Sequence, residues 1–476
     1  MKMFSFPVSA SRRYNIFSLL AVAGCLFFSA CQKDSFITSG NAGLGTSADS
    51  LTFDTVFTSI GSITQSFKLI NTNSQKLLLS SVQLQGGPSS AFTVNINGIA
   101  SAAASNIEIA ANDSIYVFVT VRINPNLADL PFIVQDTVAI SYNGNIKKVG
   151  LQAYGQNANF LRGRTITGNV VFTSNKPYVL LGGFKVDTNA TLTLEAGCRI
   201  YAHADSPVFI DGTLIANGTK ENPVIFTGDR LDEDYKDFPA SWPGIYFRGS
   251  SKNNFLTHTV VKNAYQAIVA ESPANNSNSK IRLQQCIIDN AYDAGILCIG
   301  STLEADNSLI SNCGSNINIL LGGKYSFVNC TIAAYSTYIS HKKPVLSINN
   351  FLLLNGNTIT NEINANFTNC ILWGEDGQVK DEIIVNKQGN DAFSVKFNNC
   401  LYKVESAPVN SSFIASIQNE QPLFDSIDVS KKIFDFHISS ALAPGLNKGV
   451  AVPFLKDLDG NNRSNGIPDI GCYEQQ

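Results

Sequence analysis

Short segments in which apolar and polar residues alternate with a period of two dominate the chain from about residue 47 to residue 157. Four of them, SITQSFKLINTN, SNIEIAANDSIYVFVTVRINP, QDTVAISYNG and KKVGLQAYGQ, are separated by Asn, Gly and Pro turns. In the second segment, one predicted face holds Ile115, Val117, Val119 and Val121, and the other holds Tyr116, Phe118 and Thr120. About seven such strands predict an immunoglobulin-like β-sandwich over residues 47–157. No candidate site is predicted in it.

From about Asn159 the pattern changes to short strands broken by Gly and Asn. Six segments align without gaps: LTHTVVKNA, LQQCIIDNA, EADNSLISNC, SFVNCTIAA, NFTNCILWG and KFNNCLYKV. One aligned column holds Thr259, Cys286, Ser308, Cys330, Cys370 and Cys400, each followed by two positions that are apolar or nearly so. Four places after the column stand Asn263, Asn290 and Asn312. The intervals along the column range from 22 to 40 residues.

A repeat of this length, with one strand signal and one turn signal, is typical of a stacked solenoid. The small Cys, Ser and Thr side chains would stack in the core, and the asparagines would form a hydrogen-bonded ladder at a turn. We therefore predict a right-handed parallel β-helix over residues 158–402, in which the 40-residue interval holds two coils. The column cysteines are then core residues rather than ligands. Cys298 and Cys313 either pair with each other or stay free, and no CxxC pair indicates a zinc site.

Composition and the N-terminal region bear on location. The net charge is −3 and the part of the chain after residue 31 has no basic run, so nothing indicates a nucleic-acid partner. Residues 1–30 combine early basic residues with a short apolar run, as a secretory signal does. They end in Phe28-Ser29-Ala30 before Cys31, which resembles a bacterial lipobox. The resemblance implies a lipid (palmitate) on Cys31, a tether over residues 31–46, and anchoring at the outer membrane or cell surface.

Two further segments resemble a known family. ATLTLEAGCRIYAHADSPVFIDGTLIANGTKENPVIFTGDR resembles the opening coils of exported right-handed parallel β-helix proteins. DLDGNNRSNGIPDIGCYE resembles the closing segment called the choice-of-anchor Q domain, with Cys472 in place of the usual Ala. This resemblance implies a C-terminal cap over residues 403–476, in which an Arg–acid contact locks the segment over the last coil. The cap residues are Asp457, Asp459, Arg463, Asp469 and Glu474.

The family includes lyases, glycosidases and many members without known chemistry, so it specifies activity weakly. The vWiDH and RxPxxR segments of pectate lyases do not occur here, and neither do the NTD, DD and GHG segments of polygalacturonase-type hydrolases. The four histidines share no motif, and we interpret them as coil or turn residues: His203, His258, His341 and His437. No catalytic residue is assigned.

One acidic loop, GDRLDEDYKDFPASWPGIYF, lies between two apolar strand signals. It holds Asp229, Asp232, Glu233, Asp234 and Asp237, together with Tyr235 and Trp242. We interpret it first as a solvated lateral loop whose aromatic side chains pack back on the coil. The alternative is a glycan or metal contact, in which the aromatic rings stack on sugar and the carboxylates hold Ca²⁺. No metal is assigned, and Ca²⁺ is the one cofactor left open.

Three functions fit these observations. The first is a lipid-anchored surface module whose β-helix binds glycans or other extracellular partners without catalysis. The second is a polysaccharide lyase or glycoside hydrolase with an active site assembled across coils. The third is a structural or adhesion component of the surface. The expected partners are the membrane, through the lipid, and an extracellular polysaccharide.

Overall fold

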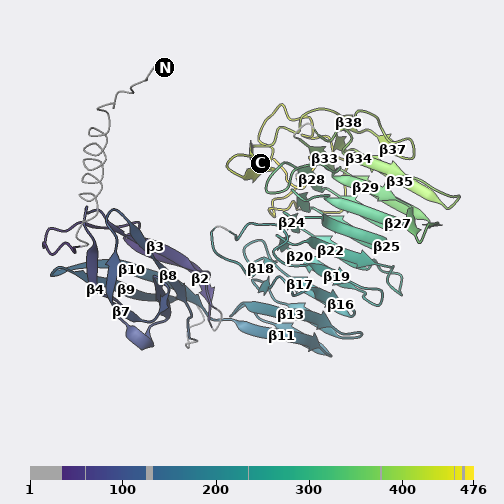
Figure 1. The fold of residues 1–476 in the computed structure, drawn as a ribbon. Helices are drawn as coiled ribbons and strands as arrows, with labels where there is room; N and C mark the ends of the chain where they lie inside the picture. Colours follow the sequence, from purple (N-terminus) through teal and green to yellow (C-terminus); the bar gives the residue numbers. More distant parts are fainter. Residues whose placement is uncertain are drawn as a thin grey trace, which may run out of the picture. The chain divides into compact units, whose positions relative to one another are not determined.

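The computed structural model describes residues 35–58, 61–124, 132–233, 235–375, 378–454, 456–463 and 467–475. They form two compact units, of which the first extends to Gly155 and the second begins at Gln156 (Figure 1). The predicted signal, Cys31 and Asp234 lie outside the described residues. Within those ranges, no helix has the length and apolar character to cross a membrane.

The first unit contains two five-stranded antiparallel sheets. In spatial order, one sheet holds β1 (Leu44–Thr46), β3 (Gln65–Asn71), β8 (Ser114–Val121), β5 (Phe92–Ile96) and β6 (Ile99–Ala100). The other holds β2 (Ser50–Phe57), β10 (Asn145–Gln156), β9 (Phe132–Tyr142), β4 (Leu77–Leu84) and β7 (Ala103–Ile109). A single 3-10 turn, Gly87–Ser89, precedes β5.

Alternation along β8 shows why these segments form a sandwich. Val117 and Val119 are fully buried, whereas the alternate residues Tyr116 and Phe118 are exposed. Because successive side chains of a strand point to opposite faces, the pattern buries one face against the second sheet. The predicted all-β fold with an N-terminal sandwich is confirmed.

The predicted tether of residues 31–46 is too long. Leu44 begins strand β1 and is buried, and Ala42 is buried beside it. The Gly43 amide donates to Asn73 Oδ1 (2.9 Å), and Asn143 Nδ2 donates to the Ile37 carbonyl (2.9 Å). The Ser/Gly/Ala-rich composition suggested a free linker, but these backbone groups are held by asparagine side chains of the sandwich.

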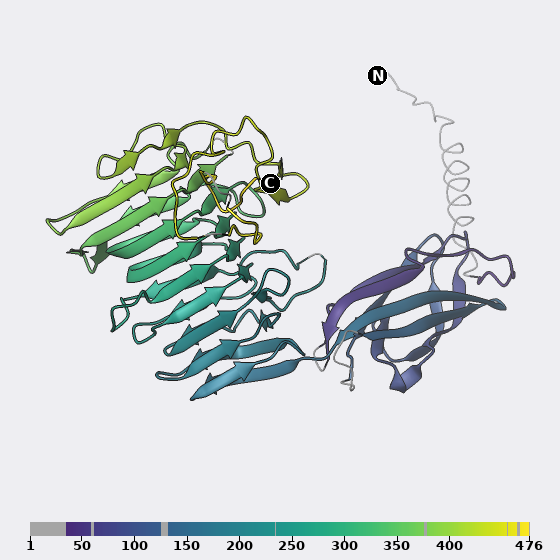
Figure 2. The same cartoon turned by 180° about the vertical axis from the view of Figure 1, so that it is seen from behind.

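The second unit is built on a 26-stranded sheet in which each strand pairs in parallel with strands of neighbouring coils (Figures 1 and 2). After β11 (Asn159–Ile166), the strands form three faces. The first face holds β13 (Tyr178–Val186), β16 (Val208–Ile210), β19 (Ile245–Phe247), β22 (Gln266–Glu271), β25 (Ala294–Asp306), β27 (Ile317–Val328), β29 (Leu346–Asn349) and β34 (Ile383–Asn386).

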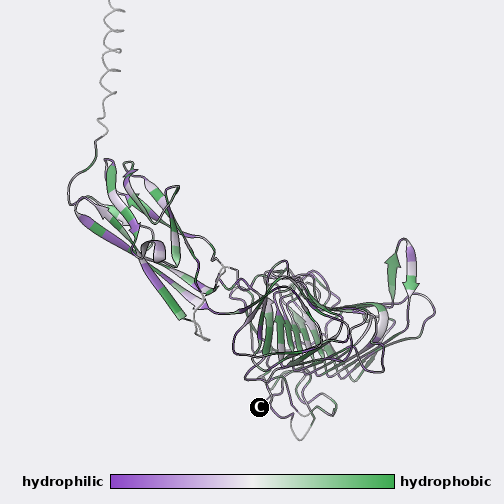
Figure 3. Ribbon diagram, turned by 90° about the horizontal axis from the view of Figure 1, so that it is seen from below, coloured by the Kyte–Doolittle hydropathy of each residue, from purple (hydrophilic) through white to green (hydrophobic). Residues whose placement is uncertain are grey.

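Long strands β25 and β27 bend into the second face. That face also holds β12 (Asn169–Phe172), β14 (Thr191–Leu194), β17 (Thr213–Asn217), β20 (Asn254–Thr257), β23 (Ile281–Gln284), β32 (Ile363–Thr368), β35 (Phe393–Asn398) and β37 (Ser412–Ile414). The third face holds β15 (Arg199–Ala202), β18 (Val224–Gly228), β21 (Thr259–Lys262), β24 (Ile287–Asp289), β26 (Leu309–Ser311), β28 (Thr331–Ala334), β33 (Ile371–Gly374), β36 (Leu401–Tyr402) and β38 (Ile417–Gln418). A long all-parallel sheet of this kind is that of a β-helix, and Figure 3 shows its coils nearly end-on.

Register on the third face places the predicted small-residue column in one stack. Ile287 pairs with Leu309, and Ile371 with Leu401, so the residues immediately before them stand above one another. All six column residues are buried, and every described cysteine is free, including Cys298 and Cys313. Burial raises the pKa of the Cys286 thiol to about 12, which keeps the sulfur protonated and unreactive. These cysteines fill the core.

Two predictions about the solenoid are wrong: the number of coils in the 40-residue interval and the C-terminal boundary at residue 402. Thr331 pairs directly with Ile371, so the 40-residue interval is one coil and not two. Its extra length includes a hairpin of β30 (Phe351–Leu354) and β31 (Asn357–Thr360). The helix also continues beyond residue 402, because β37 and β38 stack in parallel on β35 and β36. A last hairpin, β39 (Ser426–Asp428) and β40 (Ile433–Asp435), follows.

Candidate functional site

Most acids of the predicted loop are paired with bases of the same chain. Asp229 Oδ2 lies 2.8 Å from His203 Nδ1, and Arg230 contacts both carboxylate oxygens of Asp232 at 2.8 and 3.0 Å. Lys236 Nζ lies 2.6 Å from Glu233 Oε1. Across the described part of the chain, no group of three or more His, Cys, Asp or Glu side chains could hold a metal ion. Three of the five acids of the loop, Asp229, Asp232 and Glu233, therefore lie against a basic side chain.

Trp242 is a core residue, which corrects its proposed role in sugar stacking. Its side chain is 1% exposed, and its ring lies parallel to that of Phe226 with centroids 6.4 Å apart. The indole Nε1 donates to the Lys262 carbonyl at 2.9 Å. The exposed rings of the loop are those of Tyr235, which lies under the Arg230 guanidinium, and Phe238, which packs edge-on against Tyr338.

Asp237 of this loop lines a pocket of about 200 Å³ on the side of the coils. We call this pocket the flank pocket. Three asparagines of the pocket follow strands β21, β24 and β26 at equivalent turns: Asn263, Asn290 and Asn312. Their φ angles are 62°, 56° and 52°, a left-handed conformation that Asn adopts more readily than most residues. The repeat therefore delivers one amide per coil to the same flank.

Hydrogen bonds hold the first two of these amides but leave one acceptor unused. Asn290 Nδ2 donates to Asn263 Oδ1 (2.9 Å) and to the Asp237 carbonyl (2.8 Å). Asn290 Oδ1 is buried and has no hydrogen-bond partner in the described structure. The predicted ladder does not continue to Asn312, whose Nδ2 lies 3.4 Å from Asp289 Oδ1 instead. An unpartnered buried acceptor beside a pocket can take a hydrogen bond from a ligand.

Asp289 supplies a carboxyl group to the flank pocket. Burial raises its pKa and the nearby Asp237 carboxylate adds to this, whereas the Ser311 hydroxyl, which donates to Asp289 Oδ1 at 2.7 Å, lowers it. Asp237 itself is half exposed. The pocket thus brings together two carboxyl groups in different environments.

Two lysines, Thr337 and the aromatic rings of Tyr338 and Phe434 complete the flank pocket. Lys262 Nζ lies 4.0 Å from Asp237 Oδ1, and Lys432 Nζ lies 3.3 Å from the centroid of the Tyr338 ring. Tyr338 belongs to the long coil insertion and Lys432 to the β39–β40 hairpin, so neither could be placed from the repeat. The Tyr338 side chain is 39% exposed.

Two larger depressions lie beside residues 419–429, which follow strand β38. One, of about 380 Å³, is lined among others by Tyr335, Glu375 and Phe424. The other, of about 400 Å³, is lined among others by Trp373 and Lys403. Gln421 lines both depressions, and its Nε2 donates to Glu375 Oε1 at 2.6 Å. This flank of the β-helix is therefore hollowed and carries both polar and aromatic side chains.

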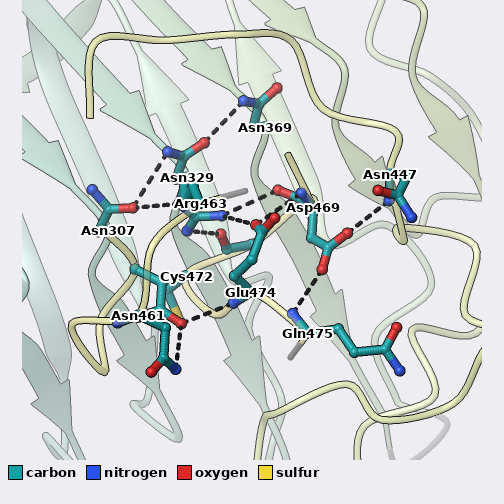
Figure 4. A network of polar contacts seen from close by, with 12 residues as sticks. Asn307, Asn329, Asn369, Asn447, Asn461, Arg463, Asp469, Cys472, Glu474 and Gln475 are labelled. Carbon is teal, nitrogen blue, oxygen red and sulfur yellow. Dashed lines mark hydrogen bonds and ion pairs between the residues drawn. The ribbon is translucent and has the colours of Figure 1, made fainter. Parts of the chain in front are cut away.

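Four of the five predicted cap residues are buried and belong to a polar network along the β-helix, shown in Figure 4: Asp457, Arg463, Asp469 and Glu474. The fifth, Asp459, is 37% exposed and lies 3.1 Å from His437 instead. Arg463 Nη1 lies 3.1 Å from Glu474 Oε2, and both side chains are 3% exposed. Asp457 and Asp469 accept backbone N–H groups, from Asn461 and Asn447 respectively, at 2.7 Å. Carboxylates that accept backbone N–H groups in this way hold the loop in place.

The position of this segment differs from the prediction that it locks over the last coil. Arg463 Nε donates to Asn307 Oδ1 (2.9 Å), and the Cys472 amide donates to Thr331 Oγ1 (3.0 Å). Asn369 exchanges hydrogen bonds with the backbone of Val450. These partners belong to successive coils, so the segment runs along the side of the solenoid.

A second asparagine column, which the sequence analysis missed, explains this placement. It consists of Asn307, Asn329, Asn369 and Asn399, each at a positive φ and each immediately before the small-residue column. Asn329 Nδ2 donates to Asn307 Oδ1 (3.3 Å), and Asn369 Nδ2 donates to Asn329 Oδ1 (2.9 Å). The repeated Asn-Cys dipeptide was the available signal.

The histidines serve structural contacts outside the flank pocket. His203 pairs with Asp229, His258 takes a left-handed turn, and His341 lies 2.8 Å from Glu382 in a buried pair. His437 lies between Asp435 and Asp459, and its ring stacks on Tyr473.

We expect the His437 contact to make stability depend on pH. Burial lowers the pKa of this imidazole, but hydrogen bonds with Asp435 and Asp459 outweigh burial and raise the pKa overall. A raised folded-state pKa stabilises the fold fully below the usual value of about 6.5, and the stabilisation is lost as the pH rises through the folded-state pKa. The melting temperature of the wild type should therefore exceed that of His437→Gln at pH 5.5, and the difference should shrink by pH 8.5. A difference that grows with pH would contradict this assignment.

Comparison with known proteins identifies the class of the second unit. Residues 164–280 match the family described as a pectate-lyase like β-helix domain. These residues therefore resemble a pectate-lyase like β-helix domain, in agreement with the long parallel sheet of the second unit. No curated protein matches the chain.

Solved structures resemble the chain only distantly. A family 123 glycoside hydrolase from Clostridium perfringens is 8% identical with a TM-score of 0.19, over 27% of this chain and 31% of the hydrolase. Dex49A from Penicillium minioluteum is 10% identical with a TM-score of 0.16, over 76% of both chains. A PapD-like domain of human CEP192 is 11% identical with a TM-score of 0.17, over 27% of this chain and 92% of that domain. Scores this low carry no argument about function.

Proposed function

We propose that the protein is a lipid-anchored surface protein whose β-helix binds an extracellular polysaccharide at the flank pocket without cleaving it. The observation that carries the proposal is that Asn290, whose buried Oδ1 has no partner in the described structure, lines a pocket together with charged groups and two aromatic rings. Sugars present many hydroxyl donors and acceptors beside apolar C–H faces. A few convergent polar groups with an aromatic ring suit such a ligand.

The location is proposed from the N-terminal sequence. The lipobox-like residues before Cys31 support diacylglyceryl attachment and retention at the outer membrane or cell surface. Cys31→Ser is expected to move the protein from the membrane fraction to the soluble fraction, as measured by fractionation and immunoblotting. A variant that stays with the membrane would contradict lipid anchoring, and Cys25→Ser in the signal serves as the matched control.

A second candidate is glycoside hydrolysis, which one observation favours. Asp289 and Asp237 line the same pocket, one partly buried with a raised pKa and the other exposed. Carboxyl groups whose environments separate their pKa values can act as general acid and base. We place binding first because Asp289 Oδ1 already accepts the Ser311 hydroxyl, and no sequence motif of a hydrolase occurs.

The experiment that separates these functions uses residues 32–476, without the lipidated cysteine. The protein is incubated with acidic and neutral polysaccharides, with and without Ca²⁺, and polymer size is followed by chromatography. Intact polymer that co-elutes with the protein is the expected result. Shortened polymer would replace binding with hydrolysis or lysis, and the loss of cleavage in Asp289→Asn would locate it. Intact polymer without co-elution would favour a structural role.

We expect Tyr338→Ala to weaken binding of the retained polymer about three- to tenfold, since an aromatic contact contributes on the order of 1 kcal/mol. Tyr265→Ala is the matched control, because Tyr265 is 45% exposed but does not line the flank pocket. Titration calorimetry measures both. Equal affinities of Tyr338→Ala and the wild type would remove the flank pocket as the binding site.

A further inference from the structure

A depression of about 530 Å³ lies on the outward face of strands β5 and β8 in the sandwich. Its floor includes Thr93 and Asn95 from β5 and Phe118 and Thr120 from β8, which alternate with core residues along their strands. The turn around Gly87–Ser89 contributes one wall. Although the alternation of β8 was recognised in the sequence, its outward residues were not treated as a site.

An aromatic pair stands at this depression. The rings of Tyr116 and Phe118 are parallel within 13°, with centroids 5.5 Å apart, and the two residues are 43% and 41% exposed. Lys68 Nζ lies 4.9 Å from the Tyr116 ring, and only Phe118 of the pair lines the depression. The solvent face of an antiparallel sheet usually carries polar residues, so two adjacent exposed aromatic rings there indicate an interaction surface.

Hydroxyl and amide groups line the depression together with the Phe118 ring and several apolar residues. Thr93 Oγ1 and Thr120 Oγ1 lie 2.6 Å apart across the two strands, and Asn95 and Ser90 line the same depression. None of the described residues that line it is charged. An acidic ligand would therefore lose hydration there without gaining a counter-charge, so the lining favours an uncharged ligand.

We propose that this face of the sandwich, through Phe118, Thr93, Thr120 and Asn95, is a second binding site that takes an uncharged polysaccharide. A pyranose ring has an apolar C–H face that suits the Phe118 ring and edge hydroxyls that suit threonine and asparagine. Apolar lining residues such as Val94, Ala100 and Ala102 suit the same C–H faces. A stable protein partner would need about 800 Å² of contact surface on this chain, which is more than one depression of this size offers. This site is independent of the flank pocket, whose lysines and aspartates carry charge.

The test uses affinity electrophoresis of residues 32–476 in gels that contain a β-1,4-glucan, a β-1,3-glucan, a galactomannan, polygalacturonate or alginate. We expect retardation by at least one neutral polymer, and Phe118→Ala should weaken that retardation at least tenfold. Thr93→Val should weaken it less, and Phe118→Trp should retain it. Tyr154→Ala is the matched control, because Tyr154 is 37% exposed on β10 in the other sheet.

Three results would overturn the proposal. One is the absence of retardation by every neutral polymer, and another is wild-type retardation of Phe118→Ala. The third is a wild-type dimer in light scattering that Phe118→Ala dissociates, because the occupant would then be a second copy of the chain. Tyr338→Ala in the same gels separates the two sites: it should leave the Phe118-dependent retardation unchanged whether or not the flank pocket binds glycan.

Discussion

Arg463→Ala is expected to lower the free energy of unfolding of the β-helix unit by about 3–5 kcal/mol, as removal of one partner of a buried ion pair does. The guanidinium of Arg463 donates to Glu474 Oε2, Asn307 Oδ1 and the Gly471 carbonyl at 3.1, 2.9 and 2.7 Å. Alanine would leave the buried Glu474 carboxylate without its counter-charge and two further acceptors without this donor. Denaturant unfolding followed by circular dichroism measures the loss.

The same variant should release the C-terminal segment before the coils unfold. Limited proteolysis is expected to cleave Arg463→Ala within residues 440–475 under conditions in which the wild type stays intact. Lys456→Ala is the matched control, because Lys456 lies in the same segment but is exposed. Arg463→Met combined with Glu474→Met should recover part of the stability, since no isolated charge then remains. Unchanged unfolding and proteolysis in Arg463→Ala would show that the network does not hold the segment.

Periodicity explains which parts of the fold could be predicted. The alternation through Val117 and Val119 identifies a sandwich strand because β-branched apolar residues recur at every second position and are buried there. The column through Cys286 and Cys330 identifies stacked coils because small buried residues recur at the same point of each turn. Both signals are local and repeated, so chance matches to them are rare.

Insertions between coils could not be predicted in the same way. The 40-residue interval has the length of two coils, and only the pairing of Thr331 with Ile371 shows that it is one. Asp237 and Asn290 were identified in two separate groups, one in the acidic loop and one in the turn column. They share the flank pocket because the loop folds back along the turns. Tyr338 and Lys432 join them from distant segments that carry no repeat.

The C-terminal segment shows where a resemblance is informative and where it is incomplete. Arg463 was expected to contact an acid, and the structure pairs it with Glu474. The location of the segment depends on the second asparagine column, whose side chains offer amides along the flank. The C-terminal motif therefore predicts contacts within the segment, such as Arg463 with Glu474. It does not predict where the segment binds, because that depends on side chains of the coils.

Trp242→Ala is expected to cost about 3–5 kcal/mol of β-helix stability, the loss typical of a large aromatic side chain removed from a core. An isolated parallel bridge between Trp242 and Ala264 draws this end of the acidic loop into the coil stack, where the ring packs on Phe226. A bridge of one residue leaves no periodic pattern in the sequence. The burial of Trp242 could therefore not be predicted from its neighbours, which include many acids. Trp242→Phe should recover part of the stability, although it loses the indole hydrogen bond to the Lys262 carbonyl.

Tyr235→Ala provides the comparison, because Tyr235 belongs to the same loop but is 41% exposed. Its effect on unfolding should stay within about 0.5 kcal/mol, as for most surface substitutions. Denaturant midpoints and polysaccharide retention, measured on both variants, separate structure from recognition. If Trp242→Ala kept its midpoint and lost only retention, the tryptophan would be a ligand contact and the acidic loop would replace the flank pocket as the site. A shifted midpoint, with Tyr235→Ala unaffected, means that the loop is fixed by its core residue Trp242.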